Sequence, residues 1–217
     1  MKRYRKWILL SIPAFLLLSA PVFASHIDRV RDDKDSLNPV FDLKKVRVST
    51  ADKRLSFEVE EYDGVGSLVL GDNGQSRGLS AVFNINCDDN SKTGWVDSYW
   101  NAKGAEYQLG YIAKKYNIGA DRYVLQNILL EEWNGSNFVT VGTYDILFKN
   151  GVVQGQTING VSFKKEFNFS EEEALVSVKL SALPKCTSNE LVVSTVSPGF
   201  IDSPRDYIED LTVRIRH

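Results

Sequence analysis

The chain has 217 residues and a mass of 24.4 kDa, with 26 Lys and Arg side chains against 28 Asp and Glu. This length suits one sizeable domain and excludes a multidomain assembly. Removal of residues 1–24, whose four charges are all basic, leaves 22 of the 26 basic side chains against all 28 acidic ones, a net charge of −6. Such an acidic chain is a poor candidate for nucleic-acid binding. Because the only Met is Met1 and the only His are His26 and His217, the composition argues against histidine catalysis, His-rich zinc sites and His/Met haem ligation.

Residues 1–24 predict a signal peptide. A basic start is followed by an apolar stretch, and Val22-Phe23-Ala24 matches the pattern of small residues before a cleavage site. The apolar stretch is too short for an ordinary membrane span, although an uncleaved N-terminal anchor is the alternative. We therefore expect cleavage before Ser25 and a soluble, periplasmic or secreted protein with no remaining membrane span.

Apolar and polar residues alternate with a period of two through most of the chain after residue 40, which is typical of half-buried strands. The stretches with this pattern are residues 46–48, 55–59, 81–85, 107–111, 123–130, 138–141, 144–148, 163–169, 175–180, 191–196 and 211–215. Turn signals such as Asn134-Gly135 and Asn150-Gly151 separate them. About eleven short strands predict an all-β, antiparallel sandwich or barrel, with one domain over residues 41–217 and a loose polar segment over 25–40.

The loop after the third of these stretches carries the most chemistry. Asn86, Asp88 and Asn90 stand at positions i, i+2 and i+4, a spacing at which short oxygen-bearing side chains converge on a hard cation such as calcium. Asp89 and Glu106 are further candidate ligands. Because two of the five candidate ligands are uncharged amides, we expect weak, structural calcium binding. The alternative is a hydrogen-bonded turn of Asp, Asn and Thr-Gly without metal.

The same region resembles a known family. Residues 83–90 (FNINCDDN), 93–95 (TGW) and 104–107 (GAEY) are similar to the I-D-T-D-x-N-x-x-T-G … G-A-[DE]-Y motif of family 9-type carbohydrate-binding modules and their DOMON-like sandwich relatives, and residues 41–46 and 55–59 are similar to their early strands. The resemblance implies a β-sandwich of jelly-roll type, often with structural calcium, and sugar held between aromatic faces. Asn86 replaces the first Asp of the motif, which removes one charge from the metal loop. The haem-binding relatives use Met and His ligands, which this chain lacks between its two ends.

Aromatic residues lie in and near this loop. Trp95, Tyr99 and Trp100 are interspersed with Asp, Asn and Lys, and Trp133 ends a later apolar stretch. Indole and phenol rings attract the C–H faces of sugars, and the polar neighbours can bond to hydroxyl groups. These four residues are therefore the candidate ligand-binding residues. The alternative is burial of Trp95 and Trp100 under their own loop, with Trp133 in the core.

Two cysteines, Cys87 and Cys186, lie in the part of the chain expected to be exported. An oxidising compartment permits them to form a disulfide. The alternative is a buried free thiol, because Cys87 continues the inward-facing series of residues 81–85.

Glu58 and Glu60 stand on one face of a predicted strand. This pattern is found in the carboxylate pair of a glycosidase, but an ordinary solvated strand face produces it as well. We expect a non-enzymatic sandwich that binds a saccharide or another cell-envelope component. The alternatives are an envelope domain that binds a protein partner and a sandwich-fold glycosidase.

Overall fold

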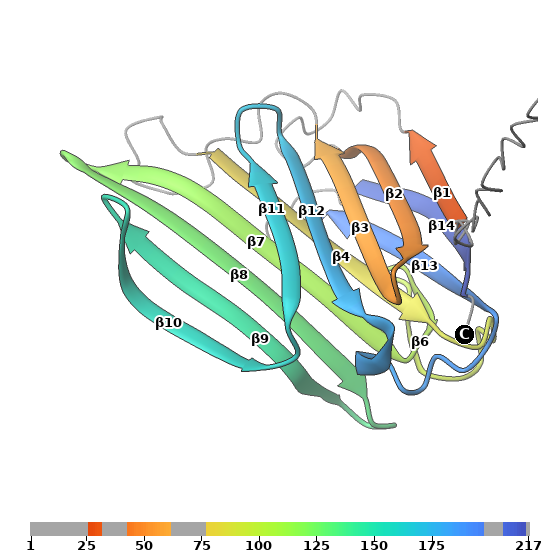
Figure 1. The fold of residues 1–217 in the computed structure, drawn as a ribbon. Helices are drawn as coiled ribbons and strands as arrows, with labels where there is room; N and C mark the ends of the chain where they lie inside the picture. Colours follow the sequence, from red (N-terminus) through yellow and green to blue (C-terminus); the bar gives the residue numbers. More distant parts are fainter. Residues whose placement is uncertain (1–25, 32–42, 62–76, 198–205, 216–217) are drawn as a thin grey trace, which may run out of the picture.

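The computed structural model describes residues 26–31, 43–61, 77–197 and 206–215 (Figure 1). The predicted signal peptide lies outside these ranges. The described chain forms fourteen strands and one short 3₁₀ helix, Leu180–Ala182. The strands are β1 (His26–Arg31), β2 (Leu43–Ala51), β3 (Arg54–Glu61), β4 (Arg77–Asn86), β5 (Trp95–Asp97), β6 (Ala102–Ala105), β7 (Tyr107–Ile118), β8 (Asp121–Trp133), β9 (Phe138–Lys149), β10 (Val152–Gly160), β11 (Phe163–Asn168), β12 (Glu173–Lys179), β13 (Glu190–Ser197) and β14 (Asp206–Arg214). No helix within these ranges has the length and apolar character needed to span a membrane.

The strands form two large antiparallel sheets and a small hairpin. One sheet has the order β1-β2-β3-β12-β11, the other β10-β9-β8-β7-β4-β13-β14, and β5 pairs with β6. Figure 1 shows the five-stranded sheet lying across one face of the seven-stranded sheet. β3 pairs with β12 and β4 pairs with β13, so each sheet joins early and late parts of the chain. The predicted all-β, antiparallel sandwich is confirmed.

The core lies between the two sheets and is built from alternate residues of each strand. Leu55, Phe57 and Val59 are fully buried on β3, and Phe83 of β4 meets Phe57 from the opposite sheet with ring centroids 4.5 Å apart. Because successive side chains of a strand point to opposite faces, the residues between them form the outer faces of the sandwich. We call the face of the seven-stranded sheet that meets the five-stranded sheet its inner face, and the opposite one its outer face.

The described strands outnumber the eleven predicted ones. β9 joins the predicted strands 138–141 and 144–148, because Gly142 and Thr143 pair regularly with Leu130 and Leu129 of β8. β5 and β6 are too short to show a period, and β10 contains glycines in place of alternation. β1 lies inside the segment 25–40 that was predicted to be loose, and it pairs with β2 at the edge of the five-stranded sheet. Its sequence, HIDRVR, has no regular alternation that would have indicated a strand.

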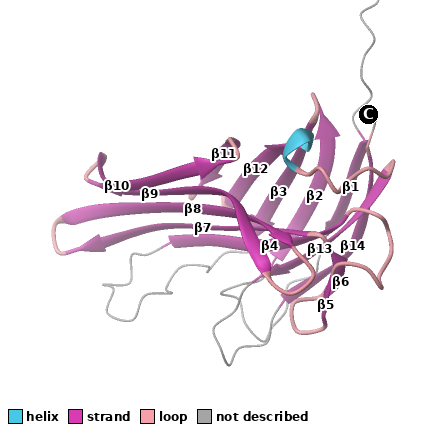
Figure 2. Ribbon diagram, turned by 90° about the horizontal axis from the view of Figure 1, so that it is seen from below, coloured by secondary structure: helices cyan, strands magenta, loops and turns pink. Residues whose placement is uncertain are grey.

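The β5–β6 hairpin has a position that matters for the candidate site. Figure 2 shows it on the outer face of the seven-stranded sheet, next to β4 and β13. The loop with the predicted metal and ligand-binding residues therefore folds back over that face.

Candidate functional site

A row of polar residues crosses the outer face of the seven-stranded sheet at one end. Neighbouring strands place them directly opposite one another in the order Ser194, Asn84, Gln108, Glu131 and Thr140. Polar residues on an outer face are ordinarily exposed, yet Asn84 and Ser194 are buried, with exposed fractions of 2% and 4%. The β5–β6 region covers this part of the row.

Side chains of the sheet hold that covering loop by its backbone. The Asn84 amide nitrogen donates to the carbonyl oxygen of Trp100 at 2.6 Å, and the Ser194 hydroxyl donates to that of Asn101 at 2.6 Å. The Asn86 amide nitrogen donates to the carbonyl oxygen of Lys103 at 2.8 Å. These three hydrogen bonds fix residues 100–103 on the sheet, since buried carbonyl groups require donors.

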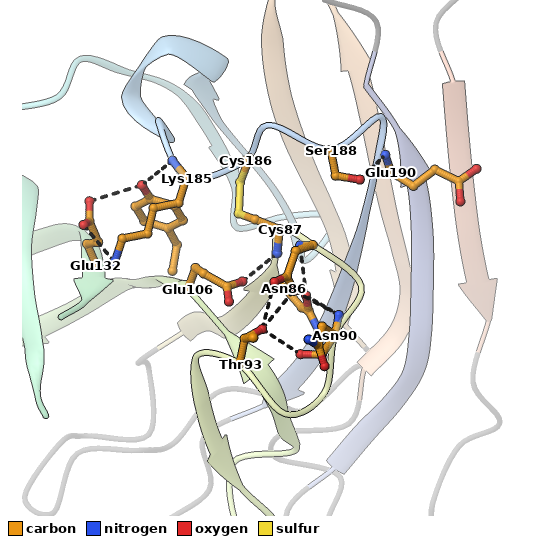
Figure 3. The surroundings of a disulfide bond; sticks show 12 residues. Asn86, Cys87, Asn90, Thr93, Glu106, Glu132, Lys185, Cys186, Ser188 and Glu190 are labelled. Carbon is orange, nitrogen blue, oxygen red and sulfur yellow. Dashed lines mark hydrogen bonds and ion pairs between the residues drawn. A yellow bond between two sulfur atoms is a disulfide. The ribbon is translucent and has the colours of Figure 1, made fainter. Parts of the chain in front are cut away.

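The oxygens of the predicted metal loop accept hydrogen bonds from the loop itself (Figure 3). Asn86 Oδ1 accepts from the backbone N–H groups of Asp88 and Asn90, at 3.2 and 3.3 Å. Asp88 Oδ1 accepts from the Asn90 N–H at 2.9 Å, and the Thr93 hydroxyl lies 2.9 Å from both oxygens of Asp88. These bonds are those of Asx turns, in which a short side chain satisfies backbone donors two to four residues later. Asp89 is exposed and has a positive φ of 54°.

Glu106 closes the loop from the other side. Its Oε2 accepts from the Cys87 N–H at 2.7 Å, and partial burial raises the pKa of its carboxyl, with Asp88 adding a smaller effect in the same direction. Within the described ranges no group of three or more His, Cys, Asp and Glu side chains is arranged to hold a metal ion. Asn86, Asp88 and Glu106 thus form the hydrogen bonds of the turn that is the alternative to a calcium site, and calcium binding stays a prediction.

Two glycines of the motif are required by this arrangement. Gly94 has a φ of +63°, and a Cβ atom there would lie 2.6 Å from the carbonyl oxygen of Ala105. Gly104 has a φ of +82°, and a Cβ atom there would collide with the carbonyl oxygen of Asn90. Other residues rarely adopt these angles and would push the two halves of the loop apart.

The structure joins Cys87 and Cys186 in a disulfide, with Cα atoms 4.4 Å apart and a sequence separation of 99. The bond ties the 86–106 loop to the segment after the 3₁₀ helix (Figure 3). Next to it, Lys185 forms an ion pair of 3.0 Å with Glu132, whose other oxygen accepts from the Tyr107 hydroxyl at 3.1 Å. Burial, above all, raises the pKa of Tyr107 to about 12, so that its hydroxyl remains a donor.

The predicted aromatic residues form two groups. Trp95 and Trp133 both pack edge-on against Phe138, with ring centroids 5.0 and 5.2 Å away. Trp133 and Phe138 stand opposite each other on the paired strands β8 and β9, and alternation from the inward-facing Glu132 places them on the outer face. All three rings are half-buried, so each is partly packed and keeps some surface for a ligand. Trp133 lies outside the core.

Tyr99 and Trp100 form the second group at the tip of the β5–β6 hairpin. Their ring centroids lie 6.0 Å apart in an edge-to-face arrangement. Tyr99 has an exposed fraction of 52% and Trp100 is half-buried. Since the Trp100 backbone is bonded to Asn84, this group also stands over the outer face.

The next two residues of the polar row, Gln108 and Glu131, stand on the sheet beside these aromatic residues. Gln108 donates to Asn84 Oδ1 at 2.9 Å, and Glu131 is half-buried beside it. The Glu131 side chain has no hydrogen bond or ion pair with any part of the chain that the structure describes, and burial raises its pKa. We call Trp95, Trp133, Phe138, Gln108 and Glu131 the aromatic shelf.

Glu58 and Glu60, the predicted alternative catalytic pair, lie on the outer face of the other sheet. Glu58 is bonded to Lys45 at 3.1 Å and to Arg47 at 3.2 Å. The hydrogen bond from Lys44 is the main cause that lowers the pKa of Glu60. A glycosidase acid needs a raised pKa, so these contacts support the interpretation as a solvated strand face.

Three residues of the shelf were not predicted as ligand-binding residues. Phe138 and Gln108 fall in the predicted strands 138–141 and 107–111, and Glu131 directly follows the predicted strand 123–130. The alternation pattern shows that Gln108 and Glu131 share a face, but the register that makes them neighbours depends on strand pairing far along the chain.

Comparison of the chain with protein-family models, with curated proteins and with solved structures finds no match in any of the three. The resemblance to family 9-type carbohydrate-binding modules therefore stays a prediction based on residues 83–107 and the early strands.

Proposed function

We propose that the protein is an exported, non-enzymatic binding protein that holds a saccharide on the aromatic shelf. The observation that carries this proposal is that Trp95, Trp133 and Phe138 share one face of the sheet with the carboxyl of Glu131, which has no partner among the described residues. Aromatic rings present flat apolar faces to the C–H groups of a sugar, while a carboxyl accepts hydrogen bonds from its hydroxyl groups.

The contacts around the aromatic shelf hold its side chains in place before a ligand binds. β8 and β9 carry Trp133 and Phe138 at adjacent positions, and the disulfide and the Asn84, Asn86 and Ser194 contacts fix the loop that carries Trp95. A site whose side chains are held before binding loses less conformational entropy when the ligand arrives.

Affinity electrophoresis through gels that contain a panel of polysaccharides tests the proposal. We expect one or more gels to retard the purified chain, and Trp133→Ala and Phe138→Ala each to weaken binding at least about tenfold, equivalent to about 1.4 kcal/mol. Tyr123→Ala is the matched control. Tyr123 stacks on Tyr116 with centroids 5.2 Å apart, and it lies ten residues from Trp133 on β8, roughly 33 Å at about 3.3 Å per residue.

Uniform mobility across the whole panel would contradict saccharide binding. Equal losses in Tyr123→Ala and Trp133→Ala would place the ligand away from the shelf.

A further inference from the structure

β10 forms a free edge of the seven-stranded sheet, and both of its faces are exposed. Among the strands that the structure describes it pairs only with β9, and all nine of its residues are exposed. Val152, Val153 and Ile158 have exposed fractions of 63%, 46% and 58%. The backbone N–H and C=O groups that point away from β9 are thus available to another strand.

The four edge strands of the two large sheets differ in charge. β1 (HIDRVR), β11 (FKKEFN) and β14 (DYIEDLTVR) each carry at least three charged residues, whereas β10 (VVQGQTING) carries none. Charged side chains on an edge oppose pairing with another chain, and their absence from a long edge strand marks an interaction surface.

The register of β10 determines how it could pair with itself. Gln156 and Ile158 stand opposite Ile146 and Tyr144 of β9, so they lie on the inner face, while Gly155 and Thr157 lie on the outer face. A register shift between Val153 and Gly155 leaves Gln154 as the extra residue, which returns Val153 to the inner face opposite Phe148.

We propose that β10 pairs antiparallel with β10 of a second copy of this chain, with the twofold axis at Gln156. In this register Gln156 faces Gln156 of the second copy, and Gly155 faces Thr157. Beyond the bulged Gln154, Val153 of one copy faces Ile158 of the other. The twofold axis generates this apolar contact twice, once on each side of Gln156. Opposite residues share a face throughout, as antiparallel pairing requires.

A second copy is the occupant that these observations favour. The strand is its own complement in register and contains no charge that would select an oppositely charged partner or repel its own copy. Pairing of two nine-residue strands buries less than the roughly 1,200 Å² of a standard stable interface. The dimer is therefore a weak one that depends on protein concentration.

Analytical ultracentrifugation of the purified chain over a range from about 10 μM to about 1 mM tests the proposal, a range suited to weak association. We expect the weight-average mass to rise from that of a monomer towards that of a dimer. Gln156→Lys and Gln156→Glu each place two like charges opposite each other across the twofold axis, and we expect each variant alone to remain monomeric. An equimolar mixture of the two variants places opposite charges there and restores dimer formation.

Thr187→Lys, which adds the same charge in an exposed loop away from β10, is the control and should associate like the unmodified chain. Circular dichroism of each variant checks that the fold is kept. A monomeric mass at every concentration overturns the proposal, and so does undiminished association of both Gln156 variants. If both variants are monomeric and their mixture also stays monomeric, the twofold register at Gln156 is wrong. None of these outcomes depends on saccharide binding.

Discussion

The buried amide of Asn84 connects the sheet to the aromatic loop: its nitrogen donates to the carbonyl oxygen of Trp100 at 2.6 Å, and its oxygen accepts from Gln108 at 2.9 Å. One side chain thus joins β4, β7 and the tip of the β5–β6 hairpin. It uses the outer face of the sheet, where a polar residue would otherwise contact only water.

Replacement of Asn84 by Ala removes a donor and an acceptor and takes these hydrogen bonds from the partly buried Trp100 carbonyl and Gln108 amide. We expect Asn84→Ala to lower the free energy of unfolding by about 1–3 kcal/mol, because buried polar groups that lose their partners carry this cost. Urea unfolding followed by fluorescence measures the loss. The control is Asn189→Ala at an exposed position, where we expect a change within about 0.5 kcal/mol. Equal stability of both variants would show that the Asn84 contacts contribute nothing.

The disulfide closes a loop with a sequence separation of 99 residues. For a loop near 100 residues, chain entropy in the unfolded state predicts a stabilisation of about 4.7 kcal/mol. We expect the double variant Cys87→Ser, Cys186→Ser to unfold at a much lower urea concentration than the oxidised chain. The unmodified chain in the presence of a thiol reductant should behave like the double variant, and an unchanged midpoint in reductant would contradict the bond's contribution.

Sequence alone predicts the strands that alternate regularly, because one face of each strand is buried and the other is not. Leu55, Phe57 and Val59 show this pattern, and all three are buried. β10 escapes prediction because both of its faces are exposed, so no pattern of burial is imposed on it.

The candidate site is predictable only in part. The loop motif locates Trp95, Tyr99 and Trp100 in sequence, and glycines at 94 and 104 follow from the local geometry of the loop. The neighbours of these aromatic residues come from distant strands, because the register that sets Glu131 opposite Gln108 is decided by core packing. Asn86 has the side-chain chemistry of a calcium ligand, and its role as a donor to Lys103 becomes visible only when the hairpin folds over the sheet.

Calcium is expected to have little effect on stability. The oxygens of Asn86, Asp88 and Glu106 already accept hydrogen bonds from backbone N–H groups of the loop, so the loop is held in its turn without an ion. We expect the thermal unfolding midpoint to be the same, within about 1 °C, in excess calcium and in a chelator. The predicted site would instead be established if the midpoint of the unmodified chain rose with calcium concentration and this rise were smaller in Asp88→Asn.

Glu61 makes stability depend on pH. It is buried, its Oε1 accepts from the Ser80 N–H at 2.9 Å, and its Oε2 has no hydrogen-bond partner among the described residues. Burial raises the pKa of this carboxyl well above its ordinary value, and the nearby Glu172 acts in the same direction. The Tyr111 hydroxyl is also buried and has no hydrogen-bond partner in the described part of the chain. The charge of ionised Glu61 adds to the burial that raises the pKa of Tyr111.

Because the folded-state pKa of Glu61 exceeds the unfolded-state value, the favourable contribution of its protonated form is complete below the ordinary pKa of a Glu. It is lost as the pH rises through the folded-state pKa. Glu61→Gln keeps an acceptor for Ser80 and removes the titration. We expect its free energy of unfolding, relative to the unmodified chain, to increase as the pH rises over this window in urea titrations. Glu171→Gln at an exposed position is the control, and a pH-independent difference between Glu61→Gln and the unmodified chain would contradict the assignment.

Glu131 gives the proposed saccharide site its own pH dependence. Burial raises its pKa, and the ionised carboxylate is the stronger acceptor for sugar hydroxyl groups, since hydrogen bonds to charged groups contribute about 1.5–3 kcal/mol. Affinity for a retarding polysaccharide should therefore fall about tenfold or more as acidification protonates Glu131, starting at a higher pH than for an ordinary Glu. Glu131→Gln removes this dependence, and at neutral pH it should bind as weakly as the acidified unmodified chain. Affinity electrophoresis at a series of pH values separates the two chains. A parallel decline of affinity in both would assign the pH dependence to another group and leave Glu131 without a role in binding.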